Sequence, residues 1–330
     1  MHKVLGFNSL YLKYNPFFII EIWLLCFFST RNSIIFKYSM IKYNPKNWFL
    51  HILSFHKSDT LRILWPEMLV LAILTFGICY LESYLIEGDG MYLKDLTLVY
   101  TLIGFALSLL LVFRTNTGYD RWWEGRKKWG ELTNNSRNIS IKIATTTQDK
   151  STKDFFIRMI PNFSFALKEH LREGVIVEEL DLTEEEKQEI DKWEHKPSYI
   201  AKMIYQKLND LKGKGVITDI EYLSIDMNLR SFSDVAGACE RIKNTPIPFS
   251  YSLFLKKVIF IYVLTMPIAF VPLFSYWAIL ITMFVFYVLV SMEVLAEEIE
   301  EPFGIDANDL PTDEICEKVR DNVREILYSE

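Results

Sequence analysis

Four long apolar runs dominate the pattern of hydrophobic and polar positions along the 330-residue chain. They lie at about residues 63–86, 96–113, 258–274 and 276–290. Each approaches the roughly 20 residues that a helix needs to cross a bilayer, whereas buried helices of soluble proteins carry runs of about 10–14. The pattern therefore predicts an all-α membrane protein with four transmembrane helices.

Local signals refine two of these helices. Trp65-Pro66-Glu67 predicts that the first helix begins at Pro66, because proline followed by an acidic residue is typical of a helix start. The third and fourth runs follow one another with almost no polar loop between them. They are therefore expected to form a tight helical hairpin.

A polar stretch separates the second and third runs. Its residues 154–173 and 183–195 have helical patterns, and Thr183 with Glu186 forms a capping-box signature. We expect a large helical cytoplasmic region there. The predicted organisation is an N-terminal extension (1–39), an N-terminal segment with two spans (40–113), the helical region (114–257), two further spans (258–295) and an acidic C-terminal region (296–330).

The first 39 residues fit this scheme poorly. The apolar run from Phe17 to Phe28 is too short to span a bilayer, contains Glu21 and is not followed by a small-residue cleavage site. It is either an interfacial segment or part of an extension upstream of a working start at Met40. We favour the second interpretation, in which residues 1–39 are not essential.

Basic residues before the first run, after the second and before the third fall on one side of the membrane. The connection between the first and second runs carries Glu87, Asp89 and Asp95 with a single lysine, Lys94. Because positive loops stay on the cytoplasmic side, the pattern predicts cytoplasmic termini and a multi-pass protein of the plasma (inner) membrane.

Composition and motifs exclude several classes. The net charge of −6 disfavours nucleic-acid binding, and the four cysteines have no paired spacing. We find no catalytic motif, so no enzyme, cofactor or metal is expected. The scarcity of ionisable residues within the spans disfavours a proton-coupled transporter. The histidines are scattered and interpreted as surface residues: His2, His51, His56, His170 and His195.

The second run contains the most informative pattern. Phe105, Leu109 and Phe113 recur every four residues and so share one face of a helix. Around an axis of several copies, this stripe would make stacked apolar rings that can gate by dewetting. Spacing alone favours the simpler alternatives, in which the stripe packs against another span or faces lipid.

A segment rich in bases and tryptophans follows directly. By itself it indicates an aromatic belt at the membrane surface with lipid-facing basic side chains. Its notable positions are Arg114, Asn116, Tyr119, Asp120, Arg121, Trp122, Trp123, Glu124, Gly125 and Arg126.

This segment, from Phe113 to Arg126, resembles the prokaryotic bestrophins. The resemblance is supported by 135–138 (Asn-Ser-Arg-Asn), by 239–242 (Cys-Glu-Arg-Ile) with 244–249, and by 301–304 (Glu-Pro-Phe-Gly). It extends from about Met40 to the C-terminus.

The resemblance implies a passive homopentameric ion channel in the lipid bilayer, with the second helix lining a central pore. The family's hydrophobic neck would map onto Phe105, Leu109 and Phe113, and a lower cytoplasmic constriction onto Leu223. The conducted ions would be anions such as chloride.

Two departures from the family pattern matter. Only Asp306 and Asp309 match the acidic run that forms a calcium clasp in eukaryotic members, which makes calcium gating doubtful. The end of the fourth run is acidic, and its residues would favour cations if they faced the vestibule: Glu293, Glu297, Glu298, Glu300 and Glu301.

Two alternatives therefore stay open. One is a cation-selective (sodium or potassium) channel of the same architecture. The other is a non-conducting membrane scaffold or sensor whose helical region binds a partner.

Overall fold

A computed structural model describes residues 60–85, 94–172 and 174–328, which all belong to one compact unit spanning 38–330. The predictions for residues 1–39 and for the start at Met40 lie outside the described residues. Within the described ranges the secondary structure is helical, without strands.

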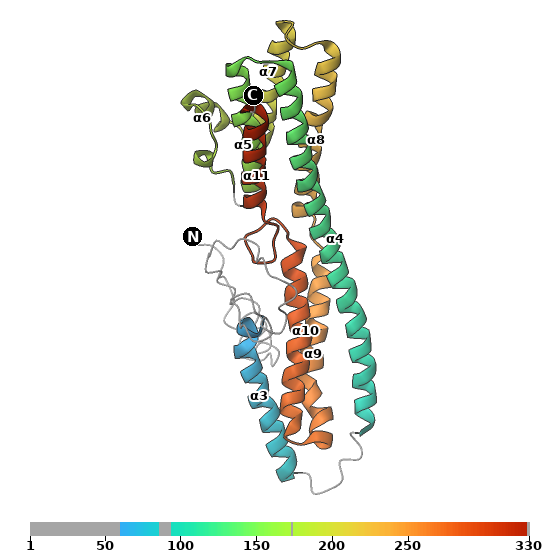
Figure 1. The fold of residues 1–330 in the computed structure, drawn as a ribbon. Helices are drawn as coiled ribbons and strands as arrows, with labels where there is room; N and C mark the ends of the chain where they lie inside the picture. The colour runs from blue at the N-terminus through green and yellow to red at the C-terminus, as the bar shows by residue number, and fades with distance from the viewer. Residues whose placement is uncertain (1–59, 86–93, 173, 329–330) are drawn as a thin grey trace, which may run out of the picture. The chain divides into compact units, whose positions relative to one another are not determined.

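Four helices are long and apolar enough to cross a membrane. They are α3 (Thr60–Leu85), α4 (Lys94–Thr146), α9 (Phe249–Phe274) and α10 (Trp277–Glu300). α10 packs against α3, α4 and α9, so these helices lie side by side (Figure 1). The four predicted spans are confirmed as helices, and the predicted hairpin is confirmed by the two-residue connection between α9 and α10.

The predicted start of the first helix is wrong. Pro66 lies inside α3, which begins at Thr60. Proline lacks the N–H that would bond to the residue four positions earlier, but helices in membranes tolerate it where neighbouring groups satisfy the freed carbonyl. The sequence signal therefore marks a proline within the first turns of the helix.

The remaining helices gather around the second half of α4. They are α5 (Lys150–His170), α6 (Glu184–Ile190), α7 (Lys196–Gly213), α8 (Asp219–Asn244) and α11 (Thr312–Tyr328), with a short 3-10 turn, η4, at Val177–Glu179. α4 packs against α8 and α11, and α5 packs against α7 and α11. The capping box predicted at Thr183 and Glu186 is present at the start of α6.

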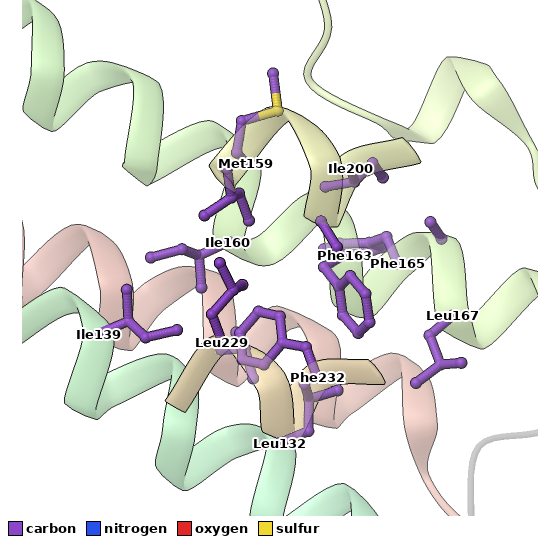
Figure 2. Packing of buried hydrophobic residues seen from close by; sticks show 14 of the residues in the cluster. Leu132, Ile139, Met159, Ile160, Phe163, Phe165, Leu167, Ile200, Leu229 and Phe232 are labelled. Carbon is purple, nitrogen blue, oxygen red and sulfur yellow. The ribbon is translucent and has the colours of Figure 1, made fainter. Parts of the chain in front are cut away.

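One hydrophobic core holds this helical region together. Leu132 and Ile139 from α4 meet Phe163 from α5 and Phe232 from α8 (Figure 2). The rings of Phe163 and Phe232 lie 4.7 Å apart between their centroids. The core therefore covers the second half of α4 on one side only. The other side of the helix is not packed against this core.

Candidate functional site

One face of α4 is uncovered along the length of the helix. The exposed positions recur three, four or seven residues apart, which places them in one stripe. The stripe begins with Leu98, Leu102, Phe105, Leu109 and Phe113 and continues with Asn116, Asp120, Trp123, Lys127, Asn134, Asn138, Ile141 and Thr145. It is apolar in the first half of the helix and mostly polar in the second.

The opposite face of α4 is buried. In the first half Leu107 and Leu111 pack inward, and in the second half Trp129 and Leu132 are fully covered. α4 is thus a two-sided helix, with one side held by this chain and the other side open.

The three residues predicted to form a neck lie on the open side. The side chains of Phe105, Leu109 and Phe113 are 67%, 46% and 63% exposed. Among the described residues no helix of the chain covers them, so packing against another span of the same chain does not explain their spacing. What remains for this stripe is contact with lipid or with other copies of the chain.

Arg114, one residue after the predicted neck, points the other way and is buried. Its Nη2 lies 2.7 Å from a carboxylate oxygen of Glu300, and its Nε lies 3.7 Å from Glu293. Both acidic residues belong to α10 and are buried as well. A buried ion pair of this kind joins α4 to α10 at the end of the apolar stripe, and removing one partner would leave the other charge uncompensated.

The acidic residues at the end of α10 are mostly engaged within the chain. Glu293 and Glu300 face Arg114, Lys256 binds Glu297 at 3.1 Å, and the Asn308 amide donates to Glu298 at 2.7 Å. These four carboxylates therefore have partners within the chain, and the cation-selective channel stays an open alternative. Glu301 is the exposed member of the set.

Arg121 anchors the next turn of α4 through backbone contacts. Its guanidinium donates to three carbonyl oxygens, those of Glu300 in α10 and of Ile242 and Thr245 at the end of α8. The indole N–H of Trp122 donates to the Asn308 carbonyl at 3.0 Å. These side chains fix the position of α4 relative to the end of α10.

Gly125 lies where α4 meets the loop after α10. A Cβ at this position would come within 3.1 Å of the Phe303 ring and 3.3 Å of Leu310. Any side chain would push Phe303, which is itself buried, away from the helix. Gly125 in the first motif and Phe303 in the later one therefore belong to one contact.

The interpretation of this segment as an aromatic belt is wrong for several of its members. Arg114, Trp129 and Gly125 are buried, and Arg121 and Trp122 are half-buried with partners inside the chain. Other members of the segment are exposed or only partly buried. Asn116, Asp120, Trp123 and Arg126 are exposed, Tyr119 is exposed with its ring 6.2 Å from that of Trp122, and Glu124 binds Arg241 at 2.6 Å. Spacing could not distinguish these environments, because they depend on which helices pack against α4.

The predicted lower constriction, Leu223, lies in the first turns of α8 and is exposed. Ile220 and Met227, one turn to either side, are more exposed still. Three large apolar side chains are thus uncovered on one face of a helix in the polar region of the chain. Of these three, only Leu223 was predicted from the sequence.

Asp306 and Asp309 lie in the loop after α10. A carboxylate oxygen of Asp309 accepts the Asp306 backbone N–H at 2.6 Å, and the side chain is buried. Burial, reinforced by the nearby Asp306 and Glu301 carboxylates, outweighs that hydrogen bond and raises the pKa of Asp309 to about 8.

Comparison with known proteins places the chain in a family. Residues 40–325 match the family described as Bacterial/Fungal Bestrophin protein. A Nostoc protein named a voltage-dependent anion channel-forming protein is 35% identical over 227 residues, covering 67% of this chain and 74% of that protein. A Salmonella typhi protein of the same name, YneE, is 30% identical and covers 85% of this chain and 91% of its own length.

Solved structures agree with the sequence relatives. The crystal structure of a bacterial bestrophin homologue from Klebsiella pneumoniae superposes with a TM-score of 0.72 at 26% identity. The match covers 82% of this chain and all of that one. With its four apolar helices and its family match from residue 40 onward, the chain is a multi-pass membrane protein that belongs to the bacterial and fungal bestrophin family.

Proposed function

We propose that this chain forms a passive ion channel whose pore is lined by α4. The observation that carries the proposal is the uncovered stripe of α4, which changes from apolar to polar near Phe113. A lipid-facing surface would be apolar through the membrane and would end there. This stripe instead continues along the same face through Asn116, Asp120 and Lys127.

A single copy cannot enclose a pore with one helix face, so the proposal requires several copies around an axis. The resemblance to bestrophins implies a homopentamer. In such a ring the open faces of five α4 helices meet, and their opposite faces are held by the core and by the Arg114 ion pairs of each subunit.

The hydrophobic neck is proposed at Phe105, Leu109 and Phe113. These side chains offer a passing ion no hydrogen bonds, so water is weakly held between them and the passage can close without a plug. From Phe105 to Phe113 the neck covers about two helical turns, roughly 12 Å at 1.5 Å per residue. Leu223, flanked by Ile220 and Met227, is proposed as a second constriction on the cytoplasmic side.

The proposed conducted ions are anions, with chloride as the first candidate. The names of the Nostoc and Salmonella relatives support anions. The acidic end of α10, which argued for cations in the sequence, is largely paired inside the chain. The exposed charges after the neck on α4 are Asp120, Arg126 and Lys127, of mixed sign. A cation-selective channel is the alternative that a reversal potential would detect.

The proposed location is the plasma (inner) membrane, with both termini in the cytoplasm. The basic flanks of the spans support this orientation. It places α5 to α8 and α11 in the cytoplasm, where the polar half of the α4 stripe would form the wider part of the pathway.

Ion flux through the purified protein in liposomes tests the function. Under an imposed salt gradient, flux with a reversal potential on the anion side is expected. A reversal potential on the cation side would select the alternative channel. Absence of flux from correctly inserted pentamers, with mass measured in detergent, would favour a scaffold or sensor instead.

The neck is tested by replacing Phe105, Leu109 and Phe113 together with alanine. We expect higher flux or loss of gating with unchanged ion preference, because the change widens and wets the passage without altering a charge. The matched control replaces Phe76, Leu280 and Phe284, which are equally exposed on α3 and α10, and should leave flux unchanged. Equal flux in the neck variant and the parent would show that the stripe is not part of the pore.

A further inference from the structure

Two histidines that are distant in the sequence meet at one carboxylate. His170 is the last residue of α5, His195 is the N-cap of α7, and Glu240 lies near the end of α8. The Nε2 atoms of the two histidines lie 2.8 Å and 2.6 Å from the same oxygen, Oε1 of Glu240. The imidazole rings are 4.6 Å apart between centroids. These two histidines are therefore not scattered as expected, although both side chains remain partly exposed.

The three side chains form an open cluster at the surface of the helical region. They are 28%, 36% and 29% exposed, and their ligand atoms all lie within 4.8 Å of one another. The three residues belong to three separate helices that pack around one core. Their donor atoms therefore approach one point from three directions. The exposed side leaves room for water.

The donor set has a clear chemical preference. Two imidazole nitrogens and one carboxylate oxygen, with a fourth position open to water, are the ligands of zinc sites with an exchangeable position. Calcium and magnesium prefer oxygen ligands alone and are poorly matched by this set. A zinc ion requires only small movements, since the ligand atoms already converge.

We propose that His170, His195 and Glu240 bind a zinc ion that ties α5, α7 and α8 together on the cytoplasmic region. The site involves none of the residues proposed for the pore, and its existence does not depend on the proposed channel function.

A metal-free hydrogen-bonded trio is the competing explanation, and one contact distinguishes the two. The Nδ1 atom of His195 accepts the Ser198 backbone N–H at 3.1 Å and so caps α7. A neutral ring that accepts at Nδ1 carries its proton on Nε2 and donates it to Glu240. When Nε2 binds zinc, the proton resides on Nδ1 instead, facing the Ser198 donor. Zinc binding must therefore break this cap, whereas the trio preserves it.

The test titrates the full-length protein in detergent, stripped with EDTA and dialysed, with zinc chloride in a calorimeter. Cobalt is added in parallel, because its absorption spectrum reports the coordination geometry. The ligand variants are His170→Ala and Glu240→Gln. The control is Glu194→Gln, an exposed acid beside the site. Hydrogen–deuterium exchange of the Ser198 amide is followed with and without zinc.

We expect one tight zinc ion per chain that each ligand variant weakens by at least about tenfold, since even outer partners of metal ligands are worth about 10–100-fold in affinity. The control should bind like the parent. Exchange at Ser198 should become faster when zinc is added to the parent.

Unchanged zinc affinity in both ligand variants would overturn the site, because the metal would then be bound elsewhere on the chain. The site would equally be overturned if the parent binds no zinc, or if Ser198 keeps its protection in the zinc-bound parent. The exchange measurement needs no substitution, so it decides the question even if a variant folds poorly.

Discussion

The four apolar helices and the polar helical region of this protein (α5 to α8, α11 and the second half of α4) differ in where they place large apolar side chains. On α3 and α10, residues such as Ile73, Leu280 and Phe284 are exposed. In the polar helical region, Ile160, Leu229 and Phe232 are completely buried in one core. The same residue types face outward in one region and inward in the other, because lipid solvates them as well as a protein core does.

The two regions also differ in how their helices begin. Asp149, Thr183 and Thr218 each cap the start of a helix in the polar helical region by accepting a backbone N–H. The starts of α9 and α10, at Pro248 and Tyr276, have no side-chain cap. What joins the two regions is α4, which passes through both.

The largest expected effect lies where the two regions meet. Replacing Arg114 with alanine leaves the buried Glu293 and Glu300 uncompensated, and it should lower the free energy of unfolding by about 3–5 kcal/mol. Unfolding in detergent by chemical denaturant measures this. The exposed Arg126→Ala on the same helix is the control and should change stability by less than about 0.5 kcal/mol. A loss as small as the control's would mean that the ion pair does not hold α4 to α10.

A matched pair of leucines tests the comparison directly. Leu229→Ala in the core of the polar helical region should cost about 2–5 kcal/mol, because it removes packed methyl groups and leaves a cavity. Leu280→Ala on the exposed face of α10 should cost less than about 0.5 kcal/mol. The same unfolding assay applies to both. Equal losses would indicate that Leu280 is covered in the assembled protein and that the contrast between the regions fails there.

The contribution of a cap is smaller. Thr183→Ala removes the hydroxyl that accepts the Glu186 backbone N–H, one of the two bonds of the capping box on α6, and should cost about 0.5–2 kcal/mol. Faster amide exchange at Glu186 would report the loss locally. Thr183→Ser, which retains the hydroxyl oxygen, should behave like the parent. If alanine and serine have the same effect, the methyl group matters rather than the cap.

The smallest effect concerns the ion pairs between α5 and α11. Burial raises the pKa of Asp313, but hydrogen bonds from Arg172 and Lys168 outweigh it and lower the pKa from 3.8 to about 2. The carboxylate therefore adds stability above pH 3.8, and this contribution disappears as the pH falls through about 2.

Because Asp313 is partly exposed, the contribution should be no more than about 1 kcal/mol. Melting temperatures of the parent and Asp313→Asn, compared at several pH values, should differ at neutral pH and converge toward pH 2. Asp321→Asn, an exposed position on the same helix, serves as the reference. A difference between the parent and Asp313→Asn that does not change with pH would contradict the assignment.

Local features of the molecule could be predicted from the sequence. The four spans, the α9–α10 hairpin and the cap at Thr183 follow from run length, loop length and residue spacing, each of which acts within a few turns of helix. The one local error, the helix start at Pro66, arose because proline is typical of a first turn but is also tolerated inside a membrane helix.

The candidate site could be predicted only in part. Spacing placed Phe105, Leu109 and Phe113 on one face but could not show that this face is uncovered. The same limitation explains the error at Arg114 and Arg121, which were expected to face lipid and instead bind within the chain. Their partners come from α10 and from the end of α8, far along the sequence, and spacing carries no information about such contacts.

The sequence by itself determined the number of spans, the family and the apolar-to-polar change along α4, because hydrophobicity and helical period are properties of neighbouring residues. Only the tertiary structure decided which side of α4 is open, that the acidic end of α10 is paired, and that His170 and His195 meet at Glu240. These features arise where helices distant in sequence pack together, and the burial of charges and of apolar surface that fixes their packing depends on the whole fold.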